Sequence, residues 1–248
     1  MAFYKVNGSD LVSIASVIRS KTGTTGPLSF PNGFVDAFLP TVELGPEGLF
    51  GELSGRLACD ASVVRGYAFC GCSDLTSVKF PSCTSIGNNA FRSCRSMTSA
   101  SFPICTTIGS HAFYACYSLT SANFPSCTTI GSNAFCYCFD MTSANFPICT
   151  SIGDGAFYPC YGLISANFPI CTSIGNDAFH SCCNLVSLYL TSVPSVPTLG
   201  DSVFTTTPIG GYSASAGRYG SVYVPASLYS SFLTATNWSS ISSRIVSV

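Results

Sequence analysis

The sequence predicts a β-rich solenoid of 22-residue repeats, with a small N-terminal helical module and a C-terminal cap of one strand and one helix. Three observations predict it: the repeat period, the alternation of apolar and hydroxyl residues within each repeat, and a charged fraction of only 8%. Proline recurs every 22 residues from Pro81 to Pro169, and Ile-Gly pairs recur from Ile86 to Ile174. A unit this short cannot bury its apolar side alone, so stacked units must share one continuous core.

Six repeat copies span residues 58–189, and each contains an Ala-Phe pair. The pairs begin at Ala68, Ala90, Ala112, Ala134, Ala156 and Ala178. A seventh copy, with a short insertion, runs from Leu190 to Phe204. Because side chains alternate along a strand, Leu75, Val78 and Phe80 are expected to point inward and the polar residues between them outward. Uncharged outward residues suit this stacking, because a charge repeated in every coil would lie next to an identical charge in the neighbouring coil and be repelled by it.

A second pattern, L-x-x-L-x-L-x-x-C, runs from Leu75 to Cys83 and continues through the copies to Leu163–Cys171. Together with Ile-Gly-x-x-Ala-Phe-x-x-Cys, it resembles the BspA-like leucine-rich repeat family over more than half of the chain. The resemblance implies a leucine-rich-repeat solenoid of α/β type. It also implies a terminal strand at 222–225 followed by a helix.

The chain divides into four predicted segments. These are a helical module at 1–44, a linker or cap at 45–57, the solenoid at 58–209 and a C-terminal cap at 210–248. Helices are predicted at 9–19 and 35–39, the first because its apolar residues share one face. The run from Leu11 to Phe34 resembles a module of gut bacteriophage tail and appendage proteins. That resemblance implies attachment to other virion proteins, or oligomerisation, through residues 1–44; the alternative is a small helical cap.

Eleven of the 15 cysteines follow each other at a step of 11 residues, so stacking places them in two ladders. One contains Cys83, Cys105, Cys127, Cys149 and Cys171, and the other Cys72, Cys94, Cys116, Cys138, Cys160 and Cys182. Three interpretations compete: buried free thiols, a disulfide scaffold, and metal binding at Cys70-Gly-Cys72, Cys136-Tyr-Cys138 or Cys182-Cys183. A ladder with one cysteine per coil is poorly suited to disulfide bonds, because bridging alternate neighbours would break the regular stacking. Metal binding is disfavoured because the sequence has only two histidines as further ligands. The pattern favours small buried thiols, and we expect no metal and no cofactor.

Two columns beside the second ladder vary between copies, whereas the core columns barely change. They run Cys70, Arg92, Tyr114, Cys136, Tyr158, His180 and Ser73, Arg95, Tyr117, Phe139, Tyr161, Cys183, with Tyr137 between them. Tyrosine and arginine on a rigid scaffold offer large contact areas and hydrogen bonds. The candidate ligand-binding residues are therefore Arg92, Arg95, Tyr114, Tyr117, Tyr137, Phe139, Tyr158, Tyr161 and His180. The alternative is that these side chains pack on one another and shield the flank of the solenoid.

The composition excludes several function classes. Ten Lys and Arg against eleven Asp and Glu leave no basic face for nucleic acid. No apolar run is long enough to insert into a membrane. Motifs of the G-x-S-x-G, H-E-x-x-H and phosphate-loop types are missing, so we predict that the protein is not an enzyme.

These observations predict a non-enzymatic binding protein. The main hypothesis is a bacteriophage virion appendage, assembled in the host cytoplasm, that recognises a bacterial surface protein or glycan. One alternative is a BspA-like adhesin on a bacterial cell surface, and another is a self-assembling structural protein. A homo-oligomer is compatible with the main hypothesis, although no pattern in the sequence requires one.

Overall fold

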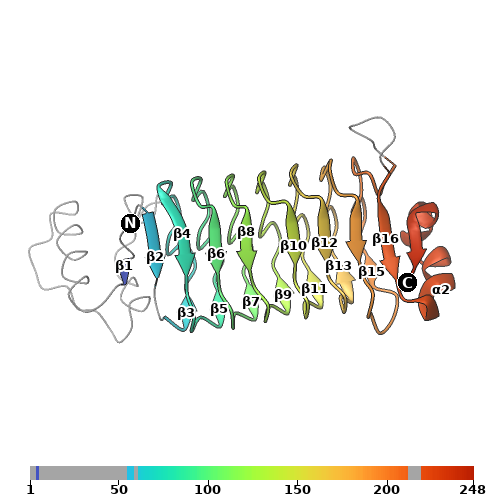
Figure 1. Ribbon diagram of the computed structural model, residues 1–248, viewed down its shortest axis with the longest axis horizontal. Helices are drawn as coiled ribbons and strands as arrows, with labels where there is room; N and C mark the ends of the chain where they lie inside the picture. The colour runs from blue at the N-terminus through green and yellow to red at the C-terminus, as the bar shows by residue number, and fades with distance from the viewer. Residues whose placement is uncertain (1–3, 6–54, 59–60, 212–218) are drawn as a thin grey trace, which may run out of the picture.

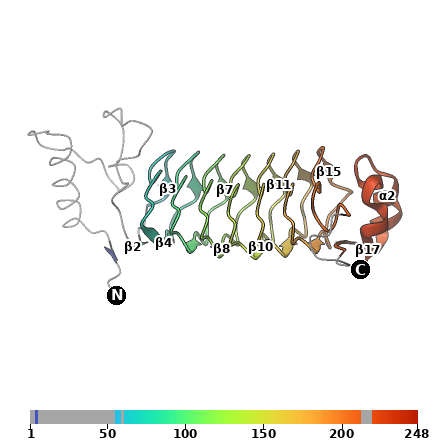
Figure 2. The ribbon, with the colours of Figure 1, turned by 90° about the horizontal axis from the view of Figure 1, so that it is seen from above.

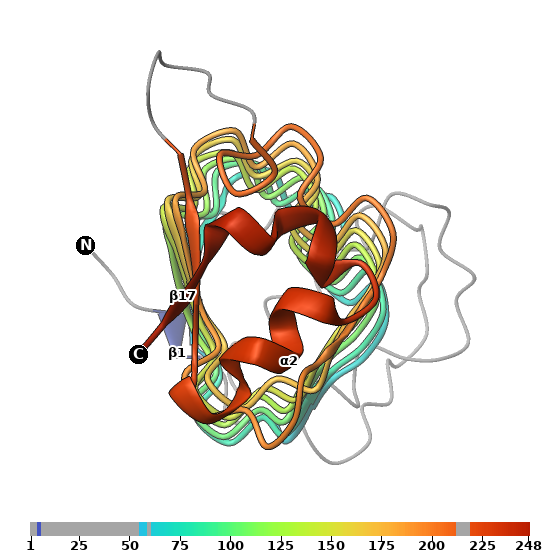
Figure 3. The ribbon, with the colours of Figure 1, turned by 90° about the vertical axis from the view of Figure 1, so that its right-hand side faces the viewer.

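The computed structural model describes residues 4–5, 55–58, 61–211 and 219–248. Between residues 61 and 211 the chain winds as stacked coils along one axis, and helices cover the C-terminal end (Figures 1 and 2). Seen along that axis, the coils superimpose into one outline (Figure 3). Seven coils each contribute a strand to the longest sheet, and β16 begins an eighth turn. The predicted solenoid and its seventh, longer copy are therefore confirmed.

The wall that we call the broad face consists of parallel strands. In the regular repeats the paired residues are 22 apart, as in Ser77 and Ser99, whereas the spacing differs for the strands at the two ends. Its strands are β1 (Tyr4–Lys5), β2 (Gly55–Ala58), β4 (Leu75–Lys79), β6 (Ser99–Ser101), β8 (Ser121–Asn123), β10 (Ser143–Asn145), β12 (Ser165–Asn167), β14 (Ser187–Tyr189), β16 (Ser221–Val224) and β17 (Ile245–Ser247). In β4, Leu75 and Val78 are buried whereas Lys79 is exposed, as the alternation predicts.

The broad face is interrupted once. Its strands form two five-stranded sheets, β1-β2-β4-β6-β8 and β10-β12-β14-β16-β17, so β8 and β10 are not hydrogen-bonded neighbours. Beneath this joint the rings of Phe124 and Phe146 are 6.0 Å apart, against 5.2–5.4 Å for the other pairs in the same row. The opposite wall continues across the joint through β9 and β11. The break in strand pairing is therefore confined to the broad face of the solenoid.

The wall that we call the narrow face is one seven-stranded parallel sheet in the order β15-β13-β11-β9-β7-β5-β3. Its strands are β3 (Val63–Val64), β5 (Ser85–Ile86), β7 (Thr107–Ile108), β9 (Thr129–Ile130), β11 (Ser151–Ile152), β13 (Ser173–Ile174) and β15 (Thr198–Leu199). The last pair joins Ser173 to Thr198, 25 residues apart, which accommodates the predicted insertion.

A wall of turns joins the narrow face to the next broad strand, and here the α/β prediction is wrong. Residues 61–211 contain no helix. Two residues in most coils have positive φ, such as Asn89 at 59° and Ser93 at 62°, and a right-handed helix cannot include them. Instead, successive backbone N–H groups donate alternately to the next coil and to their own turn. Phe91 N–H donates to Ala112 O of the next coil, and Arg92 N–H donates to Asn89 O of its own turn. The turn wall is thus a third ladder that joins the coils.

The core is filled by two interlocking rows of phenylalanine. One row runs Phe69, Phe91, Phe113, Phe135, Phe157, Phe179 and Phe204, and the other Phe80, Phe102, Phe124, Phe146 and Phe168. Successive rings in the first row are 5.1–5.4 Å apart as far as Phe179 and nearly parallel, so they follow the coil spacing. Rings of different rows meet edge to face, which suits their quadrupoles.

The C-terminal cap closes the phenylalanine rows. After β16 come the 3₁₀ helix η2 (Ala226–Leu228), α2 (Tyr229–Thr234), the 3₁₀ segment η3 (Trp238–Arg244) and β17, which returns to pair with β16. The Trp238 ring lies 5.0 Å from Phe232 and 6.2 Å from Phe204, and its Nε1–H donates to Pro197 O at 2.8 Å. The predicted strand and helix are confirmed; β17 was not predicted.

The predictions for the N-terminus mostly fall outside the described residues. This holds for the helices at 9–19 and 35–39 and for the module at 1–44, of which only Tyr4–Lys5 is described, as β1 paired with β2. The segment 45–57, predicted as a linker or cap, ends inside β2. β2 pairs with β4, so the broad face already includes residue 55.

Candidate binding surface

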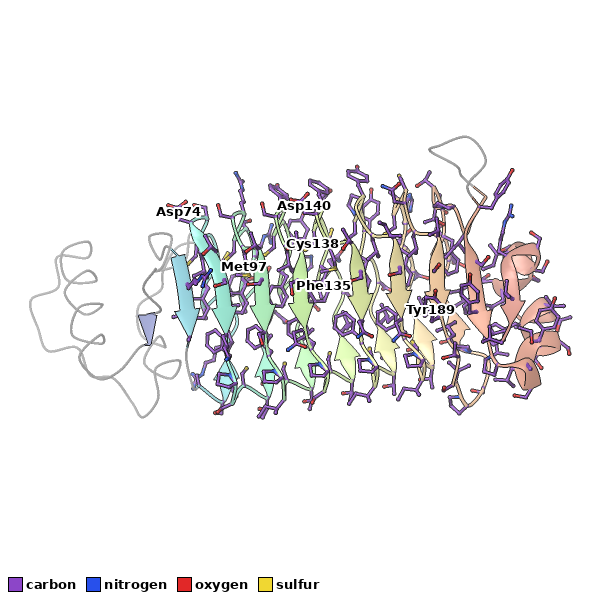
Figure 4. All side chains as sticks on the ribbon, viewed as in Figure 1. Asp74, Met97, Phe135, Cys138, Asp140 and Tyr189 are labelled. Atoms are coloured by element: carbon purple, nitrogen blue, oxygen red, sulfur yellow. The ribbon has the colours of Figure 1, made fainter. Side chains whose placement is uncertain are left out.

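The two variable columns lie in the turn wall, just before each broad strand. Figure 4 shows Asp74 and Asp140, which belong to these turns, along one edge of the solenoid. Because the coils stack in register, residues 22 apart become neighbours, and the nine predicted residues meet along this edge. We call Arg92, Arg95, Tyr114, Tyr117, Tyr137, Phe139, Tyr158, Tyr161 and His180 the aromatic strip.

The outer row of the strip is a column of stacked rings. Tyr117 and Phe139 are 5.2 Å apart with 7° between their planes, and Phe139 and Tyr161 are 5.1 Å apart with 9°. The Arg95 guanidinium lies 5.7 Å from the centre of the Tyr117 ring and begins the row. The row ends at Tyr161 because Cys183 takes the same position in the next coil. Tyr161 is 49% exposed.

The inner row is less regular because its coils carry different residues. The Arg92 guanidinium lies 4.8 Å from the centre of the Tyr114 ring, and His180 meets Tyr158 nearly edge-on at 4.9 Å. Cys136 interrupts the column between Tyr114 and Tyr158. Tyr137 fills that gap, with its ring 5.2 Å from Tyr114 and 6.4 Å from Tyr158.

Tyr137 also joins the two rows. It stands at one of the positive-φ positions of the turn wall, with φ of 63°. The same position holds Ser93 and Ala115 in the two preceding coils, so a large side chain here is specific to one coil. Its ring meets Phe139 of the outer row at 5.8 Å and 87°. The predicted residues thus form one connected surface rather than two separate columns.

The packing alternative and the binding hypothesis are both compatible with this geometry. Ring faces inside the rows cover one another, as the packing alternative requires. Ring edges remain partly exposed, and Tyr161 has a ring partner on one face only among the described residues. A ligand would therefore meet ring edges and phenol hydroxyls along the strip, and an open aromatic face at its Tyr161 end.

The two ends of the strip differ in charge. Within the described ranges, neither Arg92 nor Arg95 forms an ion pair; Arg92 donates to Asn89 Oδ1 at 3.3 Å. At the other end, His180 Nδ1 and Asp177 Oδ1 are 2.8 Å apart. Burial, and after it the Arg92 charge, lowers the pKa of His111, whose ring lies 5.5 Å from Tyr114. Sequence reasoning left His111 out of the surface because it shares no column with the other members.

A second aromatic pair lies on the broad face and was also missed. Tyr189 and Tyr223 are register partners in β14 and β16, and their rings stack at 4.8 Å and 11° (Figure 4 labels Tyr189). Tyr189 follows Asn123, Asn145 and Asn167 in its column, so a comparison of broad-strand columns could have found it.

The cysteine ladders are buried, as predicted, and every described cysteine is a free thiol. In the second ladder, each thiol from Cys94 to Cys182 donates to a phenylalanine carbonyl of the preceding coil, as in Cys138 Sγ to Phe113 O at 3.3 Å. Cysteine suits this position because it is small and apolar yet carries a weak donor for a buried carbonyl. Burial raises the pKa of Cys171 to about 11 and that of Cys127 to about 12.

Alkylation of the folded protein at neutral pH should spare all eleven ladder thiols. Burial hinders access to each of these thiols. At thiols such as Cys127 and Cys171, the raised pKa also lowers the fraction of the reactive thiolate. Intact mass after iodoacetamide treatment measures this, with Cys59→Ser removing a thiol outside the described residues. Cys183, which is less buried than the ladder thiols, should react first. After denaturation without reductant every remaining thiol should be labelled; a deficit of paired thiols would restore the disulfide interpretation.

The described residues lack two further features, a metal-binding cluster and a membrane-spanning helix. They include no cluster of three or more His, Cys, Asp or Glu side chains that could hold a metal ion. Across the same ranges, no helix has the length and apolar character needed to cross a bilayer.

The comparisons with known proteins agree with this architecture. The family described as BspA type leucine rich repeat region (six copies) matches residues 60–163 and 128–212. A leucine rich repeat protein of T. pallidum, TpLRR, has 29% identity and a TM-score of 0.58, over 64% of this chain and 78% of its own. A leucine-rich repeat protein from Bacteroides ovatus has 23% identity and a TM-score of 0.52, over 67% of this chain and 54% of its own. No curated protein matches the sequence.

The family match covers more than half of the chain, and the 22-residue register, the Ile-Gly turns and the stacked phenylalanines account for it physically. The protein is a member of the BspA-type leucine-rich repeat family.

Proposed function

We propose that this protein is a non-enzymatic adhesin that binds a ligand through the aromatic strip. The strip itself carries the proposal: nine variable side chains form one connected, partly exposed surface on a scaffold whose other columns barely change. Rigid aromatic residues give binding energy at a low cost in conformational entropy. Family membership supports binding over catalysis, and it favours a bacterial cell surface over a virion as the site of action.

A second candidate function, the bacteriophage appendage, keeps the same binding surface and changes only where it is displayed. The observation that favours it is the motif from Leu11 to Phe34, which lies outside the described residues. In this version residues 1–44 bind other virion proteins, and the strip meets a bacterial surface protein or glycan. Immunogold labelling separates the two, because an adhesin labels the producing bacterium and an appendage labels phage particles.

The double substitution Tyr117→Ala with Tyr161→Ala is expected to abolish ligand binding. It removes both outer-row tyrosines next to Phe139, and with them the open face at the end of the row. The measurement is binding of the full chain to a glycan array and to immobilised bacterial surface proteins, before and after substitution. The far-UV circular dichroism spectrum should stay unchanged.

The matched control is Tyr189→Ala with Tyr223→Ala, which removes an equally well stacked pair from the broad face. This control should bind like the unaltered protein. If the control loses binding and the strip variant keeps it, the binding surface lies on the broad face and the proposal is wrong.

A further inference from the structure

We infer that the ligand of the aromatic strip is an acidic oligosaccharide, whose carboxylate groups bind Arg92 and Arg95 while its sugar units extend along the ring edges toward Tyr161. This inference rests on the proposed function and adds the chemical class and the minimum length of the ligand.

The arginine end of the strip has unused hydrogen-bond donors. A guanidinium carries five N–H groups in a planar fork that matches a carboxylate. Arg92 uses one bond to Asn89 Oδ1, and Arg95 has no hydrogen-bond or ion-pair partner among the described residues. The ring of the next coil lies beneath each guanidinium, at 4.8 Å and 5.7 Å, which favours a fixed orientation. Two oriented guanidinium groups in one turn form a site for an anion.

Acidic residues are sparse in the coils that hold the arginine pair. Between residues 61 and 139 the chain has one acidic residue, Asp74. Asp74 accepts a hydrogen bond from Ser73, one coil before the arginine pair. The acidic residues of the later coils begin at Asp140. An anionic group is therefore attracted to the Arg92–Arg95 end rather than to the Asp177 end.

The shape of the strip suits a linear chain better than a protein surface. Protein partners typically bury about 800 Å² each around a central cluster, whereas this strip is two rows wide and follows the solenoid axis. Its steps are regular, at 5.7 Å from Arg95 to Tyr117, 5.2 Å to Phe139 and 5.1 Å to Tyr161. Each step is close to the length of one sugar unit in an extended glycan.

The same distances set the length of the ligand. Three steps separate Arg95 from Tyr161, so a chain with one sugar unit per coil needs four units to reach from the guanidinium to the open tyrosine face. Phenol hydroxyls at the ring edges would hydrogen-bond the sugar hydroxyls, and the open face of Tyr161 would stack on the last ring.

Isothermal titration calorimetry with the full chain tests the inference. The acidic probes are tetrasaccharides of galacturonate, mannuronate and hyaluronan; the comparison probes are maltotetraose, tetraglutamate and the single sugar galacturonic acid. At least one acidic tetrasaccharide should bind at least tenfold more tightly than every comparison probe. Arg92→Gln with Arg95→Gln should weaken that binding roughly 10- to 100-fold, since charged hydrogen bonds are lost. Added salt should weaken it as well.

The matched control is Arg244→Gln, which alters another arginine stacked on a tyrosine, 4.0 Å from the Tyr219 ring in the C-terminal cap. It should leave the affinity unchanged. Suppose that maltotetraose binds as tightly as the acidic tetrasaccharides, and that its binding is lost in the Tyr117–Tyr161 variant but kept in the arginine variant. This result would overturn the inference and leave the proposed function standing. Equal binding of tetraglutamate, or no binding of any acidic tetrasaccharide by the folded chain, would also overturn it. Failure of the proposed function would instead appear as glycan-array binding that the Tyr117–Tyr161 variant keeps.

Discussion

Phe135→Ala is expected to lower the free energy of unfolding by about 3–5 kcal/mol, the usual cost of removing a buried aromatic ring. Phe135 is fully buried in the central coil. Its ring stacks on Phe113 at 5.3 Å and on Phe157 at 5.4 Å, and it meets Phe124 and Phe146 of the other row at 6.1 Å and 5.8 Å. One substitution therefore removes four ring contacts and leaves a cavity that the rigid coils cannot close.

Urea denaturation followed by far-UV circular dichroism measures this loss. Phe135→Leu is the control, because it keeps most of the volume while removing the ring, and it should cost clearly less than alanine. Stability in a solenoid is approximately a sum of coil terms and nearest-neighbour interfaces. A weakened central interface should therefore broaden the transition or divide it in two. A loss below about 1 kcal/mol, with a sharp transition, would show that the core relaxes around the cavity.

The sequence was sufficient to predict the coils because every coil repeats the same solution. Phe80, Phe102 and Phe124 share a column, so a pattern that is ambiguous in one copy becomes clear over six. The turn wall could not be predicted this way. Its positive-φ positions are filled by unlike residues, among them Ser93, Ala115 and Tyr137, so no residue type identifies them. A helix was therefore a reasonable and wrong expectation for this wall.

The repeat spacing predicts which residues of the candidate surface become neighbours, but not how their side chains meet. The repeat spacing alone made Tyr117, Phe139 and Tyr161 neighbours, and the structure stacks them. The spacing could not show that Tyr137 bridges the two rows, because this depends on the direction in which a positive-φ residue projects its side chain. It also could not show that each arginine lies against a ring of the following coil, which depends on rotamers.

The cap bears on the hypothesis of a self-assembling structural protein. End-to-end stacking would need an open phenylalanine row at each end of the solenoid. At the C-terminal end, Trp238 packs against Phe204, and Phe232 packs against Trp238. Asn237 Nδ2 also donates to Leu199 O at 2.7 Å in the last coil. Capping units of this kind protect the core of a solenoid from solvent and from other copies. The cap therefore argues against a fibre that grows through this end of the solenoid.

Gly131→Ala is expected to destabilise the solenoid by about 3 kcal/mol, at the upper end of the usual cost of overpacking. A Cβ at Gly131 would lie 2.6 Å from Ser110 N and 2.7 Å from Gly109 C, which are backbone atoms of the preceding coil. Gly131 N–H also donates to Ile108 O at 2.8 Å, so the two coils cannot separate without losing that bond. The same crowding at Gly109, Gly153 and Gly175 explains why every Ile-Gly turn keeps its glycine.

Gly71→Ala separates this steric cost from the cost of backbone conformation. Gly71 has φ of 79°, but a Cβ there would meet no atom within 4 Å. The free energy of unfolding of the Gly71→Ala variant should therefore fall by only about 1–2 kcal/mol, the cost of placing an L-residue in the left-handed region. Thermal melts of the two variants, measured side by side, should show the larger decrease for Gly131→Ala, although its φ is ordinary. The reverse order would mean that neighbouring coils shift apart easily, and that backbone conformation rather than close coil stacking restricts these turns to glycine.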